Sequence, residues 1–372
     1  MTVPVSMKRI LTSCGALALL FLPACGGDTP QKPAPKAPAP AGGTSDATDA
    51  ASKQPASKPA PKKPMPPVRV DMVMVKGLFG NDPAQPPVEN PSTPEKVALG
   101  RMLYHDKKLS KNGDISCASC HDLATYGQDN KQTSPGTGGQ PGERNTPTVW
   151  NAYRQFAQFW DYRAATVEDQ AMGPMTNAIE HGIDGEDALV AKIKEEPELV
   201  AAFAKAFPGE DPVTAENFGL AIGAFERALK TTGRWDKFVE GDSRALTNEE
   251  KAGLNTFIQV GCTTCHMTRL VGGGMQQKLG VYEPYKNAED IGRAKVTGNE
   301  AEKYFFKVPS LLNVEKTAPY NHDGGTATLE EVVKEMGQLQ LNKKLSDDEV
   351  ASIITFLKAL TAELPADIVA GK

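Results

Sequence analysis

The sequence predicts a mainly α-helical protein, and three observations carry this prediction. Capping signatures of the form Ser/Thr-x-x-Glu stand directly before stretches whose apolar residues recur at helical spacing. Strand signals are few, and Gly- and Pro-rich loops at residues 133–147 and 271–298 separate the helical stretches. A cysteine motif occurs twice, 145 residues apart, with a predicted helix before each copy. We therefore expect two helical domains, at residues 68–240 and 241–372.

Four helices can be placed from their caps and apolar stripes. Ser92-Thr93-Pro94-Glu95 is a capping box with proline at the first helical position, and its helix should run through Leu103. A second helix is predicted by an apolar stripe at Phe218, Ile222, Phe225 and Leu229. Thr247-Asn248-Glu249-Glu250 opens a third helix in the same way as the first. Ser346-Asp347-Asp348-Glu349 opens the last one, whose apolar face is Val350, Ile353, Ile354, Leu357 and Leu360.

The first 24 residues predict an export signal peptide. Lys8 and Arg9 form a short basic region, residues 10–22 are mostly apolar, and Leu22-Pro23-Ala24-Cys25 follows. That ending is similar to the lipobox of bacterial lipoproteins, which implies a lipid on Cys25. A plain cleavable signal without lipid is the alternative. We expect a periplasmic protein that this lipid anchors to the outer membrane.

Residues 25–67 are predicted to be a lipidated N-terminus and a disordered Pro/Ala/Lys-rich tether, because they hold too few apolar side chains for a core. From residue 68 on, the chain carries 33 basic and 43 acidic residues, a net charge of −10. An acidic body without a Lys/Arg-rich face is a poor binder of nucleic acid. No later apolar run reaches the length of a membrane span, which excludes an integral membrane enzyme.

The repeated cysteine motif points to a cofactor. Its copies are Cys117-Ala118-Ser119-Cys120-His121 and Cys262-Thr263-Thr264-Cys265-His266, and Cys-x-x-Cys-His is the attachment motif of c-type haem. The two cysteines of each copy would form thioethers to the haem, and the adjacent histidine would ligate its iron. A thioredoxin-like redox pair and a zinc site are the alternatives. The predicted fold is thus two c-type cytochrome-like helical domains, each carrying one covalently bound haem.

At this point the sequence resembles the bacterial di-haem cytochrome c peroxidases, over roughly residues 90–362. The resemblance rests on several stretches in the family's order: Leu99 to His121, Arg144-Asn145-Thr146-Pro147-Thr148, Phe159-Trp160-Asp161-Tyr162-Arg163-Ala164, Val308-Pro309-Ser310-Leu311-Leu312-Asn313-Val314 and Thr317-Ala318-Pro319-Tyr320-Asn321-His322-Asp323-Gly324. Two positions depart from the family pattern. Leu312 stands where the family usually has arginine, and Tyr162 where it usually has glycine.

The resemblance implies an N-terminal peroxidatic haem and a C-terminal electron-transfer haem. His266 and Met336 would ligate the second iron, with His322 in the wall of that pocket. His/Met ligation raises the reduction potential, so this haem can accept electrons from a donor. Core packing is the other interpretation of Met336.

The first iron would be ligated by His121. Many family members carry a distal histidine sixteen residues later, where this chain has Thr137. The distal position should therefore be open in the resting enzyme, and His181 is the one nearby histidine that offers an alternative ligand. His105 is expected to pack or to lie at the surface.

The resemblance also supplies residues for peroxide chemistry. Gln170 and Glu180 would line the distal pocket, with Glu180 moving the proton between the two peroxide oxygens. Trp160 would lie between the haems and shorten the electron path. Asn145, Thr317 and Pro319 would hold a Ca²⁺ through oxygen atoms. For Glu180 a surface carboxylate, and for Trp160 an ordinary buried aromatic, are the alternatives.

We therefore predict a peroxidase that reduces hydrogen peroxide to water with electrons from a small cytochrome c or cupredoxin. A related oxidase is one alternative, similar to the methylamine-utilisation di-haem enzyme that oxidises a protein; that group also lacks the distal histidine, but it places a tyrosine where Met336 is expected to ligate. A non-catalytic electron-transfer cytochrome is the other alternative. The family resemblance also implies a homodimer.

Overall fold

A computed structural model describes residues 65–83 and 88–370. The predicted signal peptide, Cys25 and nearly all of the tether lie outside these residues. The described residues belong to one compact unit, Lys62–Lys372. Within them, no helix is both long enough and apolar enough to cross a membrane.

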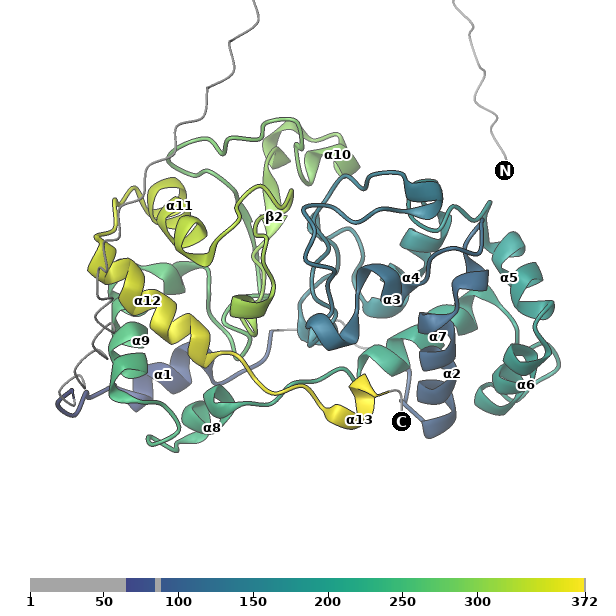
Figure 1. Cartoon of the computed structure of the whole chain (residues 1–372), viewed down its shortest axis with the longest axis horizontal. Coiled ribbons are helices and arrows are strands. Elements are labelled where there is room, and N and C mark those ends of the chain that lie inside the picture. Colours follow the sequence, from purple (N-terminus) through teal and green to yellow (C-terminus); the bar gives the residue numbers. More distant parts are fainter. Residues whose placement is uncertain (1–64, 84–87, 371–372) are drawn as a thin grey trace, which may run out of the picture. The chain divides into compact units, whose positions relative to one another are not determined.

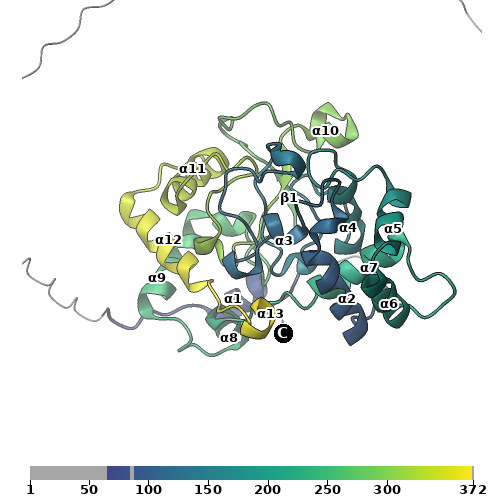
Figure 2. The ribbon, with the colours of Figure 1, turned by 45° about the vertical axis from the view of Figure 1, so that its right-hand side comes forward.

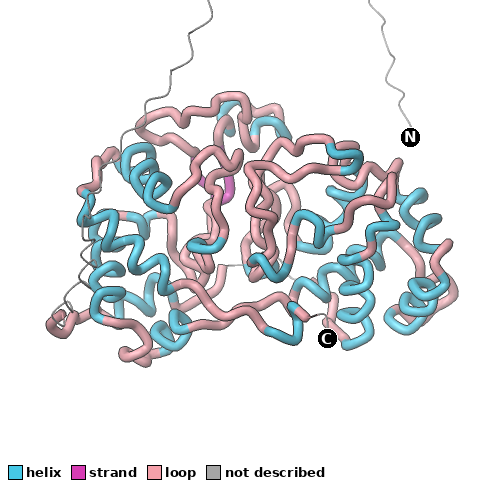
Figure 3. Tube along the Cα trace, in the orientation of Figure 1, coloured by secondary structure: helices cyan, strands magenta, loops and turns pink. Residues whose placement is uncertain are grey.

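The described part is helical, with long loops between the helices (Figures 1 and 3), as the sequence predicts. Its first helices are α1 (Met72–Phe79), α2 (Pro94–His105), α3 (Cys117–Cys120), α4 (Val167–Thr176), α5 (Glu186–Lys194), α6 (Pro197–Ala206), α7 (Ala215–Glu226) and α8 (Arg234–Glu240). The later ones are α9 (Asn248–Val260), α10 (Ala294–Thr297), α11 (Leu329–Leu341), α12 (Asp347–Ala359) and α13 (Ala366–Val369). The strands β1 (Gln276–Lys278) and β2 (Phe305–Lys307) form one antiparallel pair.

Helices α2, α9 and α12 begin where the sequence predicts helix starts. At the start of α2 the hydroxyl of Thr93 accepts a hydrogen bond from the Lys96 amide, a simple cap in place of the predicted capping box with Glu95. Thr247 and Ser346 form reciprocal capping boxes with the glutamates three residues on, at the starts of α9 and α12. One member of the predicted apolar stripe, Leu229, lies beyond the end of α7. Leu229 is buried but lies in the turn that follows the helix.

Buried apolar side chains form two clusters. The first is built mainly from α2, α4, α5, α6 and α7, and the second mainly from α9, α11 and α12. Helices α1 and α8 contribute Val75, Phe79, Trp235 and Phe238 to the second cluster, although both precede residue 240. Conversely, the C-terminal residues 364–369 belong to the second half of the chain but pack against the first cluster. Figure 1 and Figure 2 both place α13 near α2, and α1 beside α8 and α9. The division into domains at residue 240 stays a prediction.

In each cluster one glycine brings two helices into contact. A Cβ atom at Gly100 of α2 would lie 2.1 Å from the Ala221 carbonyl oxygen of α7. A Cβ atom at Gly253 of α9 would lie 2.2 Å from the Ser352 carbonyl oxygen of α12. Only glycine permits backbones to approach this closely. The helix before each cysteine motif thus packs against a later helix in the same way in both halves, which supports the predicted duplication.

The substitution Gly253→Ala should destabilise the protein by about 1–3 kcal/mol, because the new methyl group forces α9 away from α12. Denaturant unfolding of the haem-loaded protein, followed by circular dichroism, measures this loss. Gly77→Ala in α1 is the matched control, because that helical glycine has no other heavy atom near its missing Cβ. The control should gain up to about 1 kcal/mol from helix propensity. Equal stability of the two variants would show that the α9–α12 contact is looser than the structure indicates.

Candidate functional site

The first cysteine motif opens onto a cavity of about 450 Å³. Cys117 and Cys120 form the single turn α3, and a reciprocal capping box between Ser116 and Ser119 starts this turn. Both thiols are free, and both line the cavity with His121. One helical turn places the two sulfur atoms on the same side of the backbone. Burial raises the pKa of Cys117 to about 12, so this thiol is neutral.

His121 is held from two sides. The Tyr104 hydroxyl donates to the main-chain oxygen of His121 over 2.6 Å. The ring Nδ1 lies 3.3 Å from the Gly127 carbonyl oxygen, which orients the ring and leaves Nε2 for a ligand. Burial lowers the pKa of His121, so its imidazole is neutral.

The second motif repeats this arrangement at a cavity of about 240 Å³. Cys262 and Cys265 are free and lie on a 3₁₀ turn at Cys262–Thr264. The ring Nδ1 of His266 is 3.2 Å from the Val271 carbonyl oxygen, and burial lowers the pKa of His266 to about 4. Met336, on α11, lines the same cavity as His266. A methionine on the wall of this cavity could ligate the iron of a haem that His266 would hold.

Both sites fit a covalently attached haem. Each offers two free thiols at the edge of a cavity and a neutral, oriented imidazole beside them. Among the residues that the structure describes, no group of three or more His, Cys, Asp and Glu side chains could hold a metal ion. A zinc site built on either cysteine pair therefore lacks its remaining protein ligands.

The predicted acid–base residues lie in the first cavity. Gln170 of α4 and Glu180, in the turn after that helix, both line it. Burial raises the pKa of Glu180, although Arg163 nearby and a hydrogen bond from the Asn177 amide partly oppose the shift. The Asn177 amide nitrogen is 2.9 Å from Glu180 Oε1. A carboxyl group whose pKa is raised holds a proton more readily than an exposed one, which suits it to general acid–base chemistry.

Thr137 faces away from this cavity. Its hydroxyl donates to Asp114 over 2.8 Å, and its amide donates to the Glu180 carbonyl oxygen over 2.8 Å. The neighbouring residues Pro135 and Gly136 line the cavity instead. The backbone of Thr137 thus joins this loop to the turn that carries Glu180.

Two further histidines named in the sequence analysis, His181 and His105, lie in different surroundings. His181 is buried and lines the first cavity, and its Nδ1 has no hydrogen-bond partner among the described residues. Burial lowers the pKa of His181 to about 4, so this ring is neutral. His105, at the end of α2, is exposed and contacts the edge of Tyr104.

A thin wall separates the two cavities. Eight residues line both of them: Asn145, Thr146, Pro147, Thr148, Gln155, Phe159, Trp160 and Lys307. The Trp160 indole donates to the Asn145 carbonyl oxygen over 2.9 Å, which fixes the ring in this wall. Asn145 also lines the second cavity together with Thr317 and Pro319, the other two predicted calcium residues.

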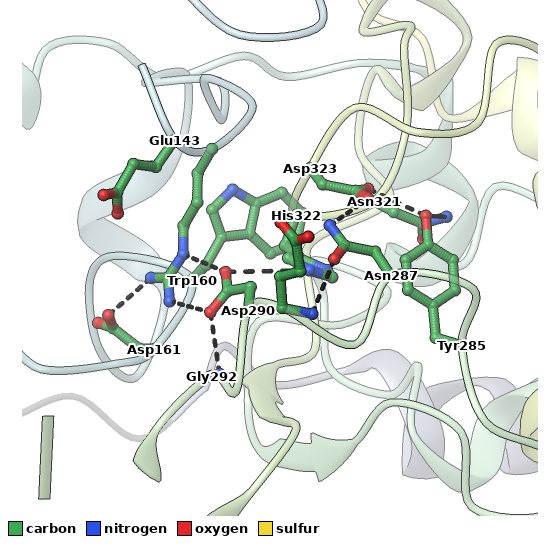
Figure 4. Close-up of polar contacts among 12 residues, drawn as sticks. Glu143, Trp160, Asp161, Tyr285, Asn287, Asp290, Gly292, Asn321, His322 and Asp323 are labelled. Carbon is green, nitrogen blue, oxygen red and sulfur yellow. Dashed lines mark hydrogen bonds and ion pairs between the residues drawn. The ribbon is translucent and has the colours of Figure 1, made fainter. Parts of the chain in front are cut away.

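An ion network secures the wall (Figure 4). Arg144 forms a two-pronged ion pair with Asp290, at 2.6 and 2.9 Å, and a third bond of 2.6 Å to Asp161. Burial alone would raise the pKa of Asp290, but the hydrogen bonds from Arg144 lower it. In the sequence analysis, Arg144 and Asp161 appear only as parts of the stretches that carry the family resemblance. Asp290 lies in a Gly- and Pro-rich loop and carries no signal of its own.

His322 lies beside this network, in the wall of the second cavity as predicted. Its ring stacks on Phe306 with 4.2 Å between the centroids, and it is almost fully buried. The Nε2 atom is 3.9 Å from an Asp290 carboxylate oxygen. Burial lowers the pKa of His322, so the ring is neutral and serves as part of the wall.

A family model described as di-haem cytochrome c peroxidase matches residues 94–244. The chain is 46% identical to the cytochrome c551 peroxidase of Nitrosomonas europaea, over 77% of this chain and 86% of that protein. The chain belongs to the di-haem cytochrome c peroxidase family. It is therefore a di-haem peroxidase, and the family implies c-type haem as its cofactor.

Two further comparisons agree with this family. The cytochrome c peroxidase Ccp of Escherichia coli is 42% identical over 75% of this chain, and the aligned part spans 61% of that longer protein. Among solved structures, a MauG-like protein associated with microbial copper homeostasis superposes with a TM-score of 0.67 at 30% identity. That match covers 76% of this chain and 93% of the other.

Glu226, a residue that sequence reasoning missed, also lines the first cavity. It is the last residue of α7 and is buried. Burial first, and the nearby Glu168 second, raise the pKa of Glu226 to about 8. Its one signal in the sequence is its position next to Phe225, a member of the apolar stripe of α7.

Glu226 makes the stability of the protein depend on pH. Below about pH 4.5 this carboxyl is protonated in both the folded and the unfolded chain. As the pH rises toward 8, the unfolded chain releases the proton and the folded chain keeps it, so the free energy of unfolding falls. The total loss is on the order of a few kcal/mol.

The substitution Glu226→Gln should remove the fall in the free energy of unfolding that Glu226 causes between pH 4.5 and pH 8. The variant should therefore be more stable than the wild type at pH 8 but not at pH 4.5. Denaturant unfolding at several pH values measures the difference. Glu216→Gln, at an exposed position of the same helix, is the control and should leave the pH dependence unchanged. A Glu226→Gln curve parallel to that of the wild type would mean that Glu226 is ionised in the folded protein.

Proposed function

We propose that this peroxidase reduces hydrogen peroxide to water in the first cavity, with electrons that enter at the second haem. The observation that carries the proposal is the placement of Glu180. This partly buried carboxyl lines the same cavity as the Cys117–Cys120 pair and His121, and Gln170 lines it as well. Across the wall that contains Trp160 lies the second cysteine pair.

Glu180 supplies the acid–base step. Peroxide must lose a proton from one oxygen and gain one on the other before its O–O bond breaks. A haem held by His121 supplies the electrons for that cleavage. Because burial keeps its pKa raised, Glu180 can take up the first proton and return it to the departing oxygen. Asn177 holds the carboxyl in place for this transfer.

The second site is proposed to receive electrons. His266 and Met336 would hold its haem, since a thioether ligand favours the reduced iron more than a second imidazole does. Trp160 contributes its ring to the wall between the cavities and would shorten the electron path. The donor is a small periplasmic cytochrome c or a cupredoxin. The net charge of −10 from residue 68 on favours encounter with a basic donor over an acidic one.

The first cavity is proposed to have an open distal position at rest. Thr137 offers no iron ligand, and its hydroxyl is already bonded to Asp114. The backbone bonds from Thr137 to Ile179 and Glu180 support a loop that stays in place through turnover. The open position is what links this chain to the methylamine-utilisation type of oxidase, but Met336 in the second cavity favours the peroxidase.

The remaining parts of the proposal concern assembly and location. Asn145, Thr317 and Pro319 come together at the second cavity, which supports a Ca²⁺ bound there through oxygen atoms. An export signal with a lipid on Cys25, and hence an outer-membrane anchor facing the periplasm, follows from the N-terminal sequence. The homodimer follows from the family resemblance. We keep the two haem domains at residues 68–240 and 241–372 as part of this proposal.

The substitution Glu180→Gln should lower peroxide turnover by about 10²–10⁴-fold, because the amide cannot carry the proton. Steady-state oxidation of a reduced cytochrome c by peroxide measures turnover, and visible spectra verify that both haems are unchanged. Glu143→Gln is the matched control. That carboxylate lines the same cavity but is exposed and paired with Lys295, so its variant should keep most of the activity. Full activity of Glu180→Gln would remove Glu180 from the mechanism.

The fully oxidised enzyme should show one high-spin ferric haem in its electron paramagnetic resonance spectrum, because Thr137 cannot ligate the first iron. Turnover should then start without prior reduction. Two low-spin haems, together with activity only after reduction, would contradict the open site. In that case His181→Ala identifies the ligand: a high-spin signal that appears in this variant assigns the sixth position to His181.

A further inference from the structure

One buried lysine in the wall between the cavities has no role in the chemistry described above. Lys307 is the last residue of β2, and its side chain is only slightly exposed. It lines both cavities. Among the residues that line the second cavity, Lys307 is the one Lys, Arg, Asp or Glu side chain.

The backbone fixes the position of Lys307. Its amide donates to the Trp160 carbonyl oxygen over 2.7 Å, and its Nζ donates to the Ala157 carbonyl oxygen over 2.9 Å. On the same strand, the preceding residue Phe306 stacks on His322. Since neighbouring side chains on a strand point to opposite faces, Lys307 points from the second half toward the segment that carries Trp160.

The lysine lacks an acidic partner in the described part of the chain. No carboxylate there lies within ion-pair distance of its Nζ. Asp161 is the acidic group that acts on it electrostatically, but Arg144 and Arg163 already bind that carboxylate. Glu180, in the first cavity, is held by Asn177. A buried ammonium group with one carbonyl contact carries a large desolvation cost, unless an anion is brought to it.

The haem-loaded protein brings such anions into both cavities, because each haem carries two propionate carboxylates. We propose that Lys307 is the ion-pair partner of a haem propionate in the wall between the cavities, and that this charge raises the reduction potential of the haem that supplies the carboxylate. The inference rests on haem attachment at the two motifs. It does not depend on which oxidant is reduced or on which protein supplies the electrons.

The test replaces Lys307 in the haem-loaded enzyme and measures the midpoint potential of each haem by spectroelectrochemical titration. Lys307→Met removes the charge at similar side-chain length and should shift the reduction equilibrium of one haem roughly tenfold toward the ferric state. A tenfold change corresponds to 59 mV for one electron. The haem whose potential moves is the one that supplies the propionate. Lys307→Arg keeps the charge and should remain within about threefold of the wild type.

Two further variants keep the test decisive. Lys307→Gln retains a donor for Ala157 without the charge, and it should reproduce the shift if Lys307→Met does not fold. Lys295→Met removes an exposed lysine that lines the first cavity and pairs with Glu143, so solvent screening should leave both potentials unchanged.

A second readout reports the ion pair itself. The propionate bending band in the resonance Raman spectrum should move in Lys307→Met and Lys307→Gln but not in Lys295→Met. Unchanged potentials and an unchanged Raman band in both neutral variants would overturn the proposal and show a neutral amine bonded only to Ala157. Because neither measurement uses peroxide or a donor protein, this outcome is independent of the proposed reaction.

Discussion

The arrangement of both cavities depends on Arg144, which lies between two aspartates from opposite halves of the chain. Asp161 comes from the segment of Trp160 and Asp290 from the loop before β2. A planar guanidinium with two partly buried carboxylates has little freedom to move, since its five N–H groups point in fixed directions. Removal of the arginine would leave Asp290 without its arginine partner and Asp161 with Arg163 alone, which is far more costly at low exposure than the loss of a surface ion pair.

Neighbours of this network form the wall. Asn145, next to Arg144, donates its amide to the His322 carbonyl oxygen and accepts from the Trp160 indole. Trp160, next to Asp161, accepts from the Lys307 amide. These hydrogen bonds connect Asn145 and Trp160, in the first half of the chain, with His322 and with Lys307 of β2, in the second half. The orientation of the indole between the cavities is therefore fixed mainly by main-chain oxygen atoms, whose positions no sequence pattern reveals.

Local signals in the sequence predicted several helices well. A hydroxyl followed by a glutamate three residues on has few uses other than a cap, so α9 and α12 could be placed from short strings. Helix α2 also begins where the sequence predicts it, but the hydroxyl of Thr93 alone caps it. The motifs at Cys117 and Cys262 are equally local, because one turn of backbone determines their geometry. Family resemblance, not physical reasoning, supplied Gln170, Glu180 and Met336, and the structure places each of them on a wall of the expected cavity.

Features that arise from long-range packing could not be predicted from sequence patterns. Asp290 is one aspartate among many until the fold brings it to Arg144, more than a hundred residues away. Lys307 is one lysine in an apolar stretch of sequence, and only its burial in the fold sets it apart. Helices α1 and α8 were not predicted to join a particular cluster. Both pack in the second cluster, and that choice depends on the whole chain.

The exchange of chain ends between the two clusters has a consequence for the order of folding. Helix α1 emerges early in synthesis, but its partners lie in the second cluster, which is made last. The first cluster, in turn, is covered by residues 364–369 at the very end of the chain. Contacts between distant segments form slowly, because the chain must lose the entropy of closing a long loop before the contacts can stabilise it. Neither half can therefore reach its final packing until the C-terminal segment has joined the first cluster, and the two halves mature together.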